Sequence, residues 1–87
     1  MSNYVITTAG KEARIPSSIP YNPSSKFDRA YNAMLNLFTS KDKMSNREIY
    51  RGLSSLGPEI GISVDKALFQ SLIRLSVEAD HLRRTII

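Results

Sequence analysis

Apolar residues recur at helical spacing in three stretches of the chain. The first stretch begins near Ser24 or Ser25, where Ser25 and Asp28 give the Ser-x-x-Asp form of a helix start. Its apolar stripe comprises Phe27, Ala30, Tyr31, Met34, Leu35, Leu37 and Phe38. Spacings of three and four residues are typical of a helix that faces the core, so we predict such a helix here, ending in the polar residues 39–43.

A second helix is predicted from Ser45, because Ser45 and Glu48 form the pattern of a capping box. Its apolar stripe consists of Ile49, Leu53 and Leu56, with Tyr50 beside it. Gly57 and Pro58 follow. We expect them to end the helix, since glycine accepts the left-handed position after a helix and proline cannot continue one.

The third helix is expected to start after a cap at Ser63 and to end near Asp80 and His81. Its wide apolar stripe includes Val64, Ala67, Leu68, Leu72, Leu75 and Ala79, flanked by Phe69, Ile73 and Val77. A stripe of this width indicates contact with the rest of the protein on two sides.

The two ends of the chain read as short strands. Residues 4–8 are rich in β-branched side chains, and residues 82–87 have a β-like composition as well. Between the first strand and the first helix, prolines at positions 16, 20 and 23 indicate a linker or an extended strap. Ile15, Ile19 and Tyr21 could hold that strap on the surface. The predicted organisation is a strand and proline-rich strap over residues 1–23, followed by a helical domain over residues 24–87.

Size and composition point to one small, ordinary globular domain. The chain has 87 residues, 41% of them hydrophobic and 23% charged, and no cysteine. Its core must therefore be stabilised by apolar packing, with a second copy of the chain as a further source of burial. No apolar run approaches the ~18–20 residues of a membrane span, and the N-terminal residues lack the features of a secretory signal. We expect a cytoplasmic protein that does not associate with a membrane.

Residues 25–87 resemble the winged helix-turn-helix family. The run from Ser45 to Ile49 fits the start of that family's second helix, and the leucines of the third helix are followed by Leu82, Arg83 and Arg84, as in the family's leucine-rich third helix and basic strand. The resemblance implies a first helix packed across the other two and a short strand around Met44. It also implies a third helix that enters the major groove of DNA. The expected fold is α+β and mainly α, with three helices and a minimal sheet.

The sequence departs from this family after the third helix. Only one strand follows that helix, so an ordinary wing hairpin cannot form in sequence order. The strand at residues 4–8 could replace the missing strand by pairing with residues 82–87. Alternatively, the tail could pair with another protomer, because an exposed strand edge carries unpaired N–H and C=O groups.

The charge pattern gives candidates for contact with DNA. The formal charge of +4 permits binding to a polyanion. The candidate DNA-binding residues are Arg47, Arg51, Lys66, Gln70, Arg74, Arg83 and Arg84. Lys66, Gln70 and Arg74 follow one another at four-residue spacing and form a polar ridge on the third helix, which could meet phosphates by charge and counterion release. The alternative is a solvated helix face that keeps the domain soluble.

These observations lead to two functional hypotheses. The first is a small DNA-binding protein, such as a transcriptional regulator, that binds duplex DNA through its third helix. The second is a protein-interaction or assembly module, or a homodimer, whose contacts are Phe69, Ile73, Ile86 and Ile87, with Phe69 exposed beside the ridge. No catalytic constellation is present, and the single histidine, His81, has no cysteine or second histidine to complete a metal site. We therefore expect no enzyme activity, no cofactor, no metal and no small-molecule ligand.

Overall fold

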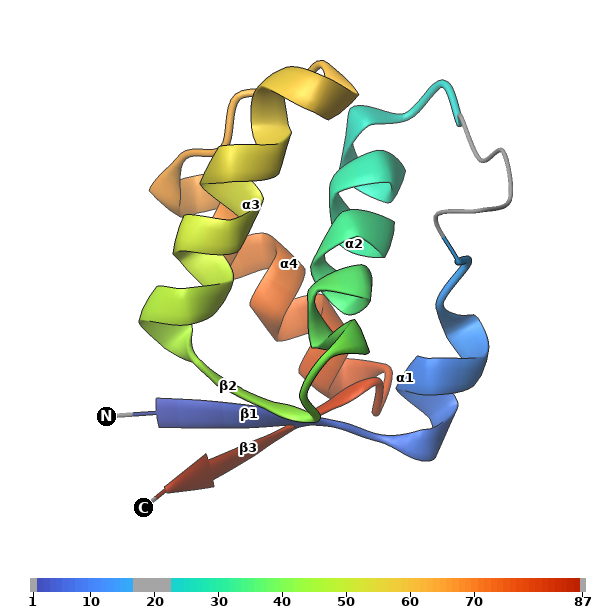
Figure 1. Ribbon diagram of the computed structural model, residues 1–87, viewed down its shortest axis with the longest axis vertical. Helices are drawn as coiled ribbons and strands as arrows, with labels where there is room; N and C mark the ends of the chain where they lie inside the picture. Colours follow the sequence, from blue (N-terminus) through green and yellow to red (C-terminus); the bar gives the residue numbers. More distant parts are fainter. Residues whose placement is uncertain (1, 17–22, 87) are drawn as a thin grey trace.

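The computed structural model describes residues 2–16 and 23–86 and shows a mainly helical α+β fold. The elements in chain order are β1 (Ser2–Ile6), α1 (Thr8–Ala13), α2 (Lys26–Asn36), a 3₁₀ turn (Leu37–Thr39), β2 (Lys43–Ser45), α3 (Asn46–Ile60), α4 (Lys66–Glu78) and β3 (Leu82–Ile86). The larger helices α2, α3 and α4 lie on one side of a small sheet (Figure 1). The expected class, mainly α with a small sheet, is confirmed.

The N-terminal strand β1 lies in the middle of the sheet. The three antiparallel strands have the order β2-β1-β3, and Val5 of β1 lies opposite both Lys43 of β2 and Arg83 of β3. The expected pairing between the two ends of the chain is confirmed, and so is the short strand around Met44. The alternative pairing of the tail with another protomer is not needed to complete the sheet.

Helix α1 was not predicted, and it shortens the strand predicted at residues 4–8. The Thr7 hydroxyl caps this helix by accepting a hydrogen bond from the Gly10 N–H at 3.0 Å, and the same hydroxyl donates to the Asp80 carbonyl. Gly10 packs against the turn before β3, because a Cβ at position 10 would lie 2.2 Å from the His81 carbonyl oxygen. The prediction that Thr7 and Thr8 continue the strand was wrong, since tertiary contact at Gly10 favours a helix here.

Helix α3 begins as predicted. The Ser45 hydroxyl accepts from the Glu48 N–H at 3.2 Å, and the Glu48 carboxylate accepts from the Ser45 N–H at 3.0 Å. The capping box is therefore confirmed. Ser25 likewise caps α2 by accepting from the Asp28 N–H.

The prediction that Gly57 and Pro58 end the second helix was wrong. Helix α3 continues through Pro58 to Ile60, and Gly61 forms its left-handed end with φ of 71°. Proline is tolerated because it lies in the last turn of the helix. Its missing N–H removes only one helical hydrogen bond, the one to the carbonyl of Ser54, and Ser54 is exposed. Gly57 instead allows the backbone at Ile62 to pack closely against α3, since a Cβ at position 57 would lie 2.8 Å from the Ile62 carbonyl oxygen.

The cap of α4 also differs from the prediction. Asp65, and not Ser63, caps the helix by accepting from the Leu68 N–H at 2.8 Å. The packed face of α4 is rotated as well: Phe69, Leu72 and Ser76 are buried, whereas Leu75 and Val77 are each 41% exposed. The width of the predicted stripe reflected apolar residues on both flanks of a narrower buried face.

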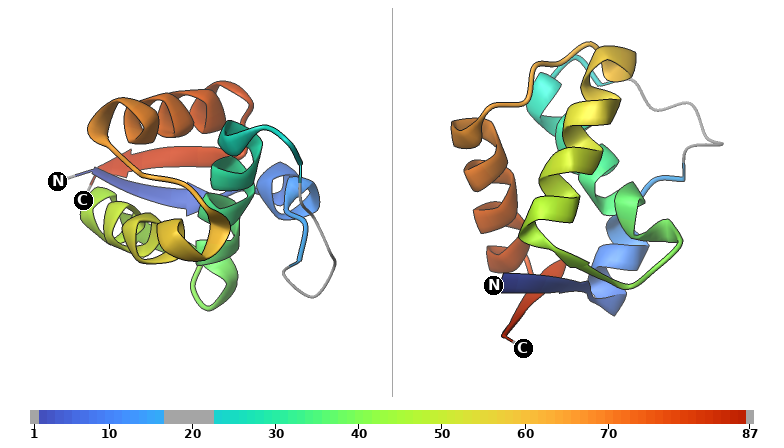
Figure 2. Two further views of the ribbon diagram at one scale, coloured as in Figure 1. Left: turned by 90° about the horizontal axis from the view of Figure 1, so that it is seen from above. Right: turned by 60° about the vertical axis from the view of Figure 1, so that its left-hand side comes forward.

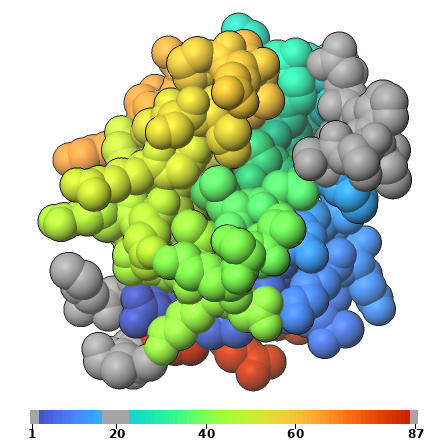
Figure 3. Space-filling model, in the orientation of Figure 1, coloured from blue at the N-terminus to red at the C-terminus, as the bar shows by residue number. Residues whose placement is uncertain are grey.

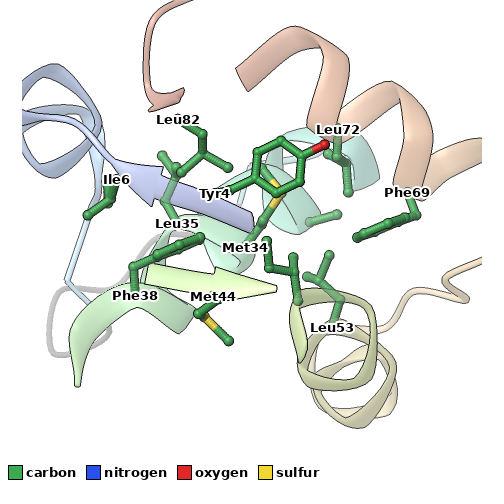
Figure 4. Packing of buried hydrophobic residues seen from close by; sticks show 12 residues of the cluster. Tyr4, Ile6, Met34, Leu35, Phe38, Met44, Leu53, Phe69, Leu72 and Leu82 are labelled. Atoms are coloured by element: carbon green, nitrogen blue, oxygen red, sulfur yellow. The ribbon is translucent and has the colours of Figure 1, made fainter. Parts of the chain in front are cut away.

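The core gathers side chains from both sheet and helices (Figure 4). Its buried members are Tyr4, Ile6, Ala30, Met34, Leu35, Phe38, Met44, Ile49, Leu53, Phe69, Leu72 and Leu82. The first predicted helix contributes the expected positions, and β1 contributes Tyr4 and Ile6. The N-terminal strand is thus part of the core of the domain rather than an appended tail.

The start of the predicted strap is held on α2 by two asparagines. The Asn32 side-chain oxygen accepts from the Ile15 N–H at 2.9 Å, and the amides of Asn32 and Asn36 donate to the Ile15 carbonyl at 3.2 and 2.9 Å. The predicted anchoring at Ile15 is confirmed, whereas Ile19 and Tyr21 lie outside the described residues.

Candidate functional site

A groove of about 410 Å³ lies between α3 and α4, over β1. Its lining residues are Tyr4, Asn46, Tyr50, Lys66, Phe69, Gln70, Ile73 and Arg74. In the projection from above, the ribbons of α3 and α4 flank β1 and β3 (Figure 2, left). The groove therefore combines the consecutive helices α3 and α4 with β1, which is distant from both in the sequence.

The floor of the groove is apolar and continuous with the core. Tyr4 and Phe69 are each only 7% exposed, and the rings of Tyr50 and Phe69 meet edge to face with centroids 5.1 Å apart. Ile73 is half-buried beside them. The expectation that Phe69 is an exposed contact was wrong: it is a core residue that also lines the groove, because it lies on the buried face of α4.

The polar ridge of α4 forms one rim. Lys66, Gln70 and Arg74 are all exposed, and all three line the groove. The opposite rim carries Asn46 and Tyr50 of α3. The structure thus places the predicted ridge in one site with Phe69 and Ile73, two of the four interaction residues of the second hypothesis.

Two further predicted cations lie on α3 and do not line the groove. Arg47 and Arg51 are exposed, and each follows a groove-lining residue, Asn46 or Tyr50, by one position. They therefore lie next to lining residues in the sequence, on the exposed surface of α3. The space-filling view shows α3 exposed along much of one face of the molecule (Figure 3).

Two acids, Glu48 at the start of α3 and Asp42 before β2, are paired with lysines that do not line the groove. Glu48 pairs with Lys41, and the Asp42 carboxylate lies 3.4 Å from the Lys11 ammonium. Hydrogen bonds from Lys41 and from the backbone of Ser45 lower the pKa of Glu48 to about 2, so this carboxylate stays ionised and paired. Its charge is then largely offset within its own ion pair.

The cations at the groove have no such partner among the residues that the structure describes. Arg47, Arg51, Lys66 and Arg74 make no ion pair there. Lys66 and Arg74 therefore present their charges to solvent on the α4 rim, and Arg47 and Arg51 present theirs on the exposed surface of α3. An arrangement of this kind attracts anions, and the guanidinium groups can hold a phosphate or carboxylate in bidentate fashion.

The structure separates the two arginines of β3. Arg84 lies opposite Tyr4, so it belongs to the helix-facing side of the sheet, whereas Arg83 lies opposite Val5 and belongs to the outer side. Lys43 also lies opposite Val5, so Lys43, Val5 and Arg83 form a cross-strand row with a cation at each end. Arg83 is therefore on a different surface from the groove.

Of the remaining predicted interaction residues, only Ile86 lies in the described part of the chain, at the end of β3. Ile86 pairs in register with Ser2 at the edge of the sheet, and Ile87 lies outside the described residues. Three groove residues, Tyr4, Asn46 and Tyr50, were not predicted. The sequence contains no signal for Tyr4, because its place in the groove depends on which strand occupies the middle of the sheet.

His81 has a structural role. Its Nδ1 lies 2.6 Å from the Tyr31 hydroxyl, within hydrogen-bonding distance, and burial raises the pKa of that phenol. The two rings also meet edge to face. In the described ranges, no three His, Asp or Glu side chains gather as a metal site, and no helix there has the length and apolarity of a membrane span.

Comparison with protein-family models, curated proteins and solved structures finds no significant match to this chain. The function must therefore be inferred from the groove and its charges.

Proposed function

We propose that the protein binds duplex DNA through α4, as a small DNA-binding protein of winged-helix type that acts as a transcriptional regulator. The observation that carries this proposal is the pair of cations Lys66 and Arg74 on the α4 rim of the groove, together with Arg47 and Arg51 on the neighbouring helix α3, each exposed and without an ion pair in the described part of the chain. Such a surface suits a polyanion whose charges are spaced along a line.

The fold supports a winged-helix interpretation. Helices α3 and α4 are consecutive and joined by a short connection, and the sheet lies beside them. In this proposal β1 stands where a wing strand would otherwise lie, between β2 and β3. An α-helix fits the major groove of DNA, where Gln70 can read adenine and Arg74 can read guanine.

The binding energy should come mainly from phosphates. Four cations that each replace a counterion give a slope of log affinity against log salt of about −3 to −4. The Lys43 and Arg83 row on the outer side of the sheet is a separate, weaker candidate for backbone contact.

Fluorescence anisotropy with a labelled duplex of random sequence, measured over a salt series, tests the proposal. The double variant Lys66→Ala/Arg74→Ala should bind more weakly at low salt, and its salt slope should be shallower by about 2. Lys26→Ala is the matched control, because Lys26 is an exposed lysine at the start of α2, outside the groove lining. Equal affinity and slope for the double variant and the unaltered protein would reject this function.

A further inference from the structure

The floor of the groove offers a contact that DNA binding through the ridge does not use. Tyr4, Tyr50, Phe69 and Ile73 form an apolar surface beside the cationic rim of α4, which carries Lys66 and Arg74, and opposite Asn46 of α3. A phosphate backbone presents charge and no bulky apolar group, so it matches the rims but not the floor. A ligand that matches both must carry an apolar group flanked by negative charges.

We propose that this groove binds an acidic peptide segment of a partner protein, with one bulky apolar side chain over the floor. Carboxylates on either side of that anchor would meet Lys66 and Arg74, which stand two helical turns apart on one rim. Charge complementarity selects an acidic partner. The volume of about 410 Å³ is of the size that accommodates a small ligand or a large side chain.

The amide side chains on the rims suit a peptide in particular. Asn46 lies on the α3 rim and Gln70 on the α4 rim, and both are exposed. Each amide carries a donor and an acceptor, which are the groups needed to pair with a peptide N–H and C=O. A buried aromatic anchor with a polar rim is also the usual form of a strong contact between proteins.

The proposal has a consequence for DNA, and this consequence alone rests on the proposed function. Lys66, Gln70 and Arg74 would serve both ligands, so an acidic peptide and a duplex could not occupy them together. A partner carrying such a segment would release the protein from DNA by mass action. Peptide binding itself stands whether or not DNA is bound.

The test uses two fluorescein-labelled probes on the full chain, Glu-Glu-Trp-Glu-Glu and Glu-Glu-Ala-Glu-Glu. Their charges are equal, so a difference in anisotropy titrations measures the apolar anchor. We expect the tryptophan peptide to bind about tenfold more tightly. Equal affinities, or no binding of either probe at low salt, would overturn the proposal. The proposal would also be wrong if an unlabelled single-stranded oligonucleotide displaced the labelled tryptophan peptide and the unlabelled tryptophan peptide did not.

Variants separate this inference from DNA binding. Ile73→Ala removes part of the floor and should weaken the tryptophan peptide about fivefold while duplex affinity changes less than about twofold. Leu75→Ala is the matched control, since it truncates an exposed apolar residue that does not line the groove, and it should change neither affinity. An Ile73→Ala variant that binds the tryptophan peptide like the unaltered protein would count against the inference.

The two proposals can fail independently. Peptide binding without duplex binding would remove the DNA function and keep the groove as a protein-interaction site. Duplex binding without preference for the tryptophan peptide would keep the DNA function and reject the peptide site. If Ile73→Ala instead altered sedimentation of the protein alone, the occupant would be a second copy of the chain, and the proposal would be wrong.

Discussion

At the scale of single residues, Glu48 closes the capping box of α3 and also pairs with Lys41. Both contacts favour the ionised carboxylate, which is why the pKa of Glu48 falls from 4.5 to about 2. A carboxyl group whose pKa is lowered on folding contributes stability that is present above its unfolded pKa. That stability is lost as the pH falls through the folded pKa, here between 4.5 and about 2.

We predict that Glu48→Gln lowers the thermal unfolding midpoint at neutral pH and that the difference from the unaltered protein shrinks as the pH falls from 4.5 to about 2. Circular dichroism melts over that pH range measure it. Glu12→Gln controls for the loss of one negative charge, since Glu12 is an exposed acid on α1. A difference between Glu48→Gln and the unaltered protein that is constant with pH would show that the carboxylate charge is not responsible.

At the scale of elements, the two candidate caps of α4 give a direct comparison. Asp65 accepts from the Leu68 N–H, whereas Ser63 is exposed and makes no capping contact in the described structure. Asp65→Ala should therefore lower the free energy of unfolding by about 1 kcal/mol. Ser63→Ala should change it by less than about 0.5 kcal/mol. Urea denaturation measures both, and a larger loss at Ser63 would place the start of the helix where the sequence alone had suggested.

These elements also show where sequence reasoning succeeds. Ser25 and Ser45 were identified as caps because the signal is local: the partner N–H lies three residues away. Ser63 and Asp65 both suit a cap, and the choice between them is made by how the preceding loop packs. Pro58 was misread for a related reason, since a proline that ends a helix and one tolerated in its last turn look alike in sequence.

The same distinction between local and long-range signals holds for the candidate site. The ridge could be predicted because Lys66, Gln70 and Arg74 are related by helical spacing within one element. The floor could not, because Tyr4 and Phe69 are separated by most of the chain and meet only through the sheet order β2-β1-β3. Phe69 and Ile73 were identified as interaction residues, but their neighbours across the groove were not.

At the scale of the whole molecule, β1 connects the fold with the site. It pairs with both other strands, and its Tyr4 is at once a member of the core and part of the groove floor. A change that removes β1 from the sheet should therefore disrupt stability and binding together. This differs from a flexible N-terminal arm, whose loss would leave the helices intact.

We predict that Val5→Pro strongly destabilises the fold, whereas Val5→Thr is tolerated. Val5 lies between Lys43 and Arg83, so its N–H faces a strand on whichever side it points. Proline removes that donor and should cost about 3 kcal/mol or more. A chain of this length has a stability of only about 4–13 kcal/mol, so such a loss removes a large part of it. Threonine keeps the β-branched shape and the N–H, which makes it the matched control.

Urea unfolding followed by circular dichroism distinguishes the two variants. An unchanged midpoint for Val5→Pro would mean that the helices fold without β1. The groove would then have to form without its floor at Tyr4.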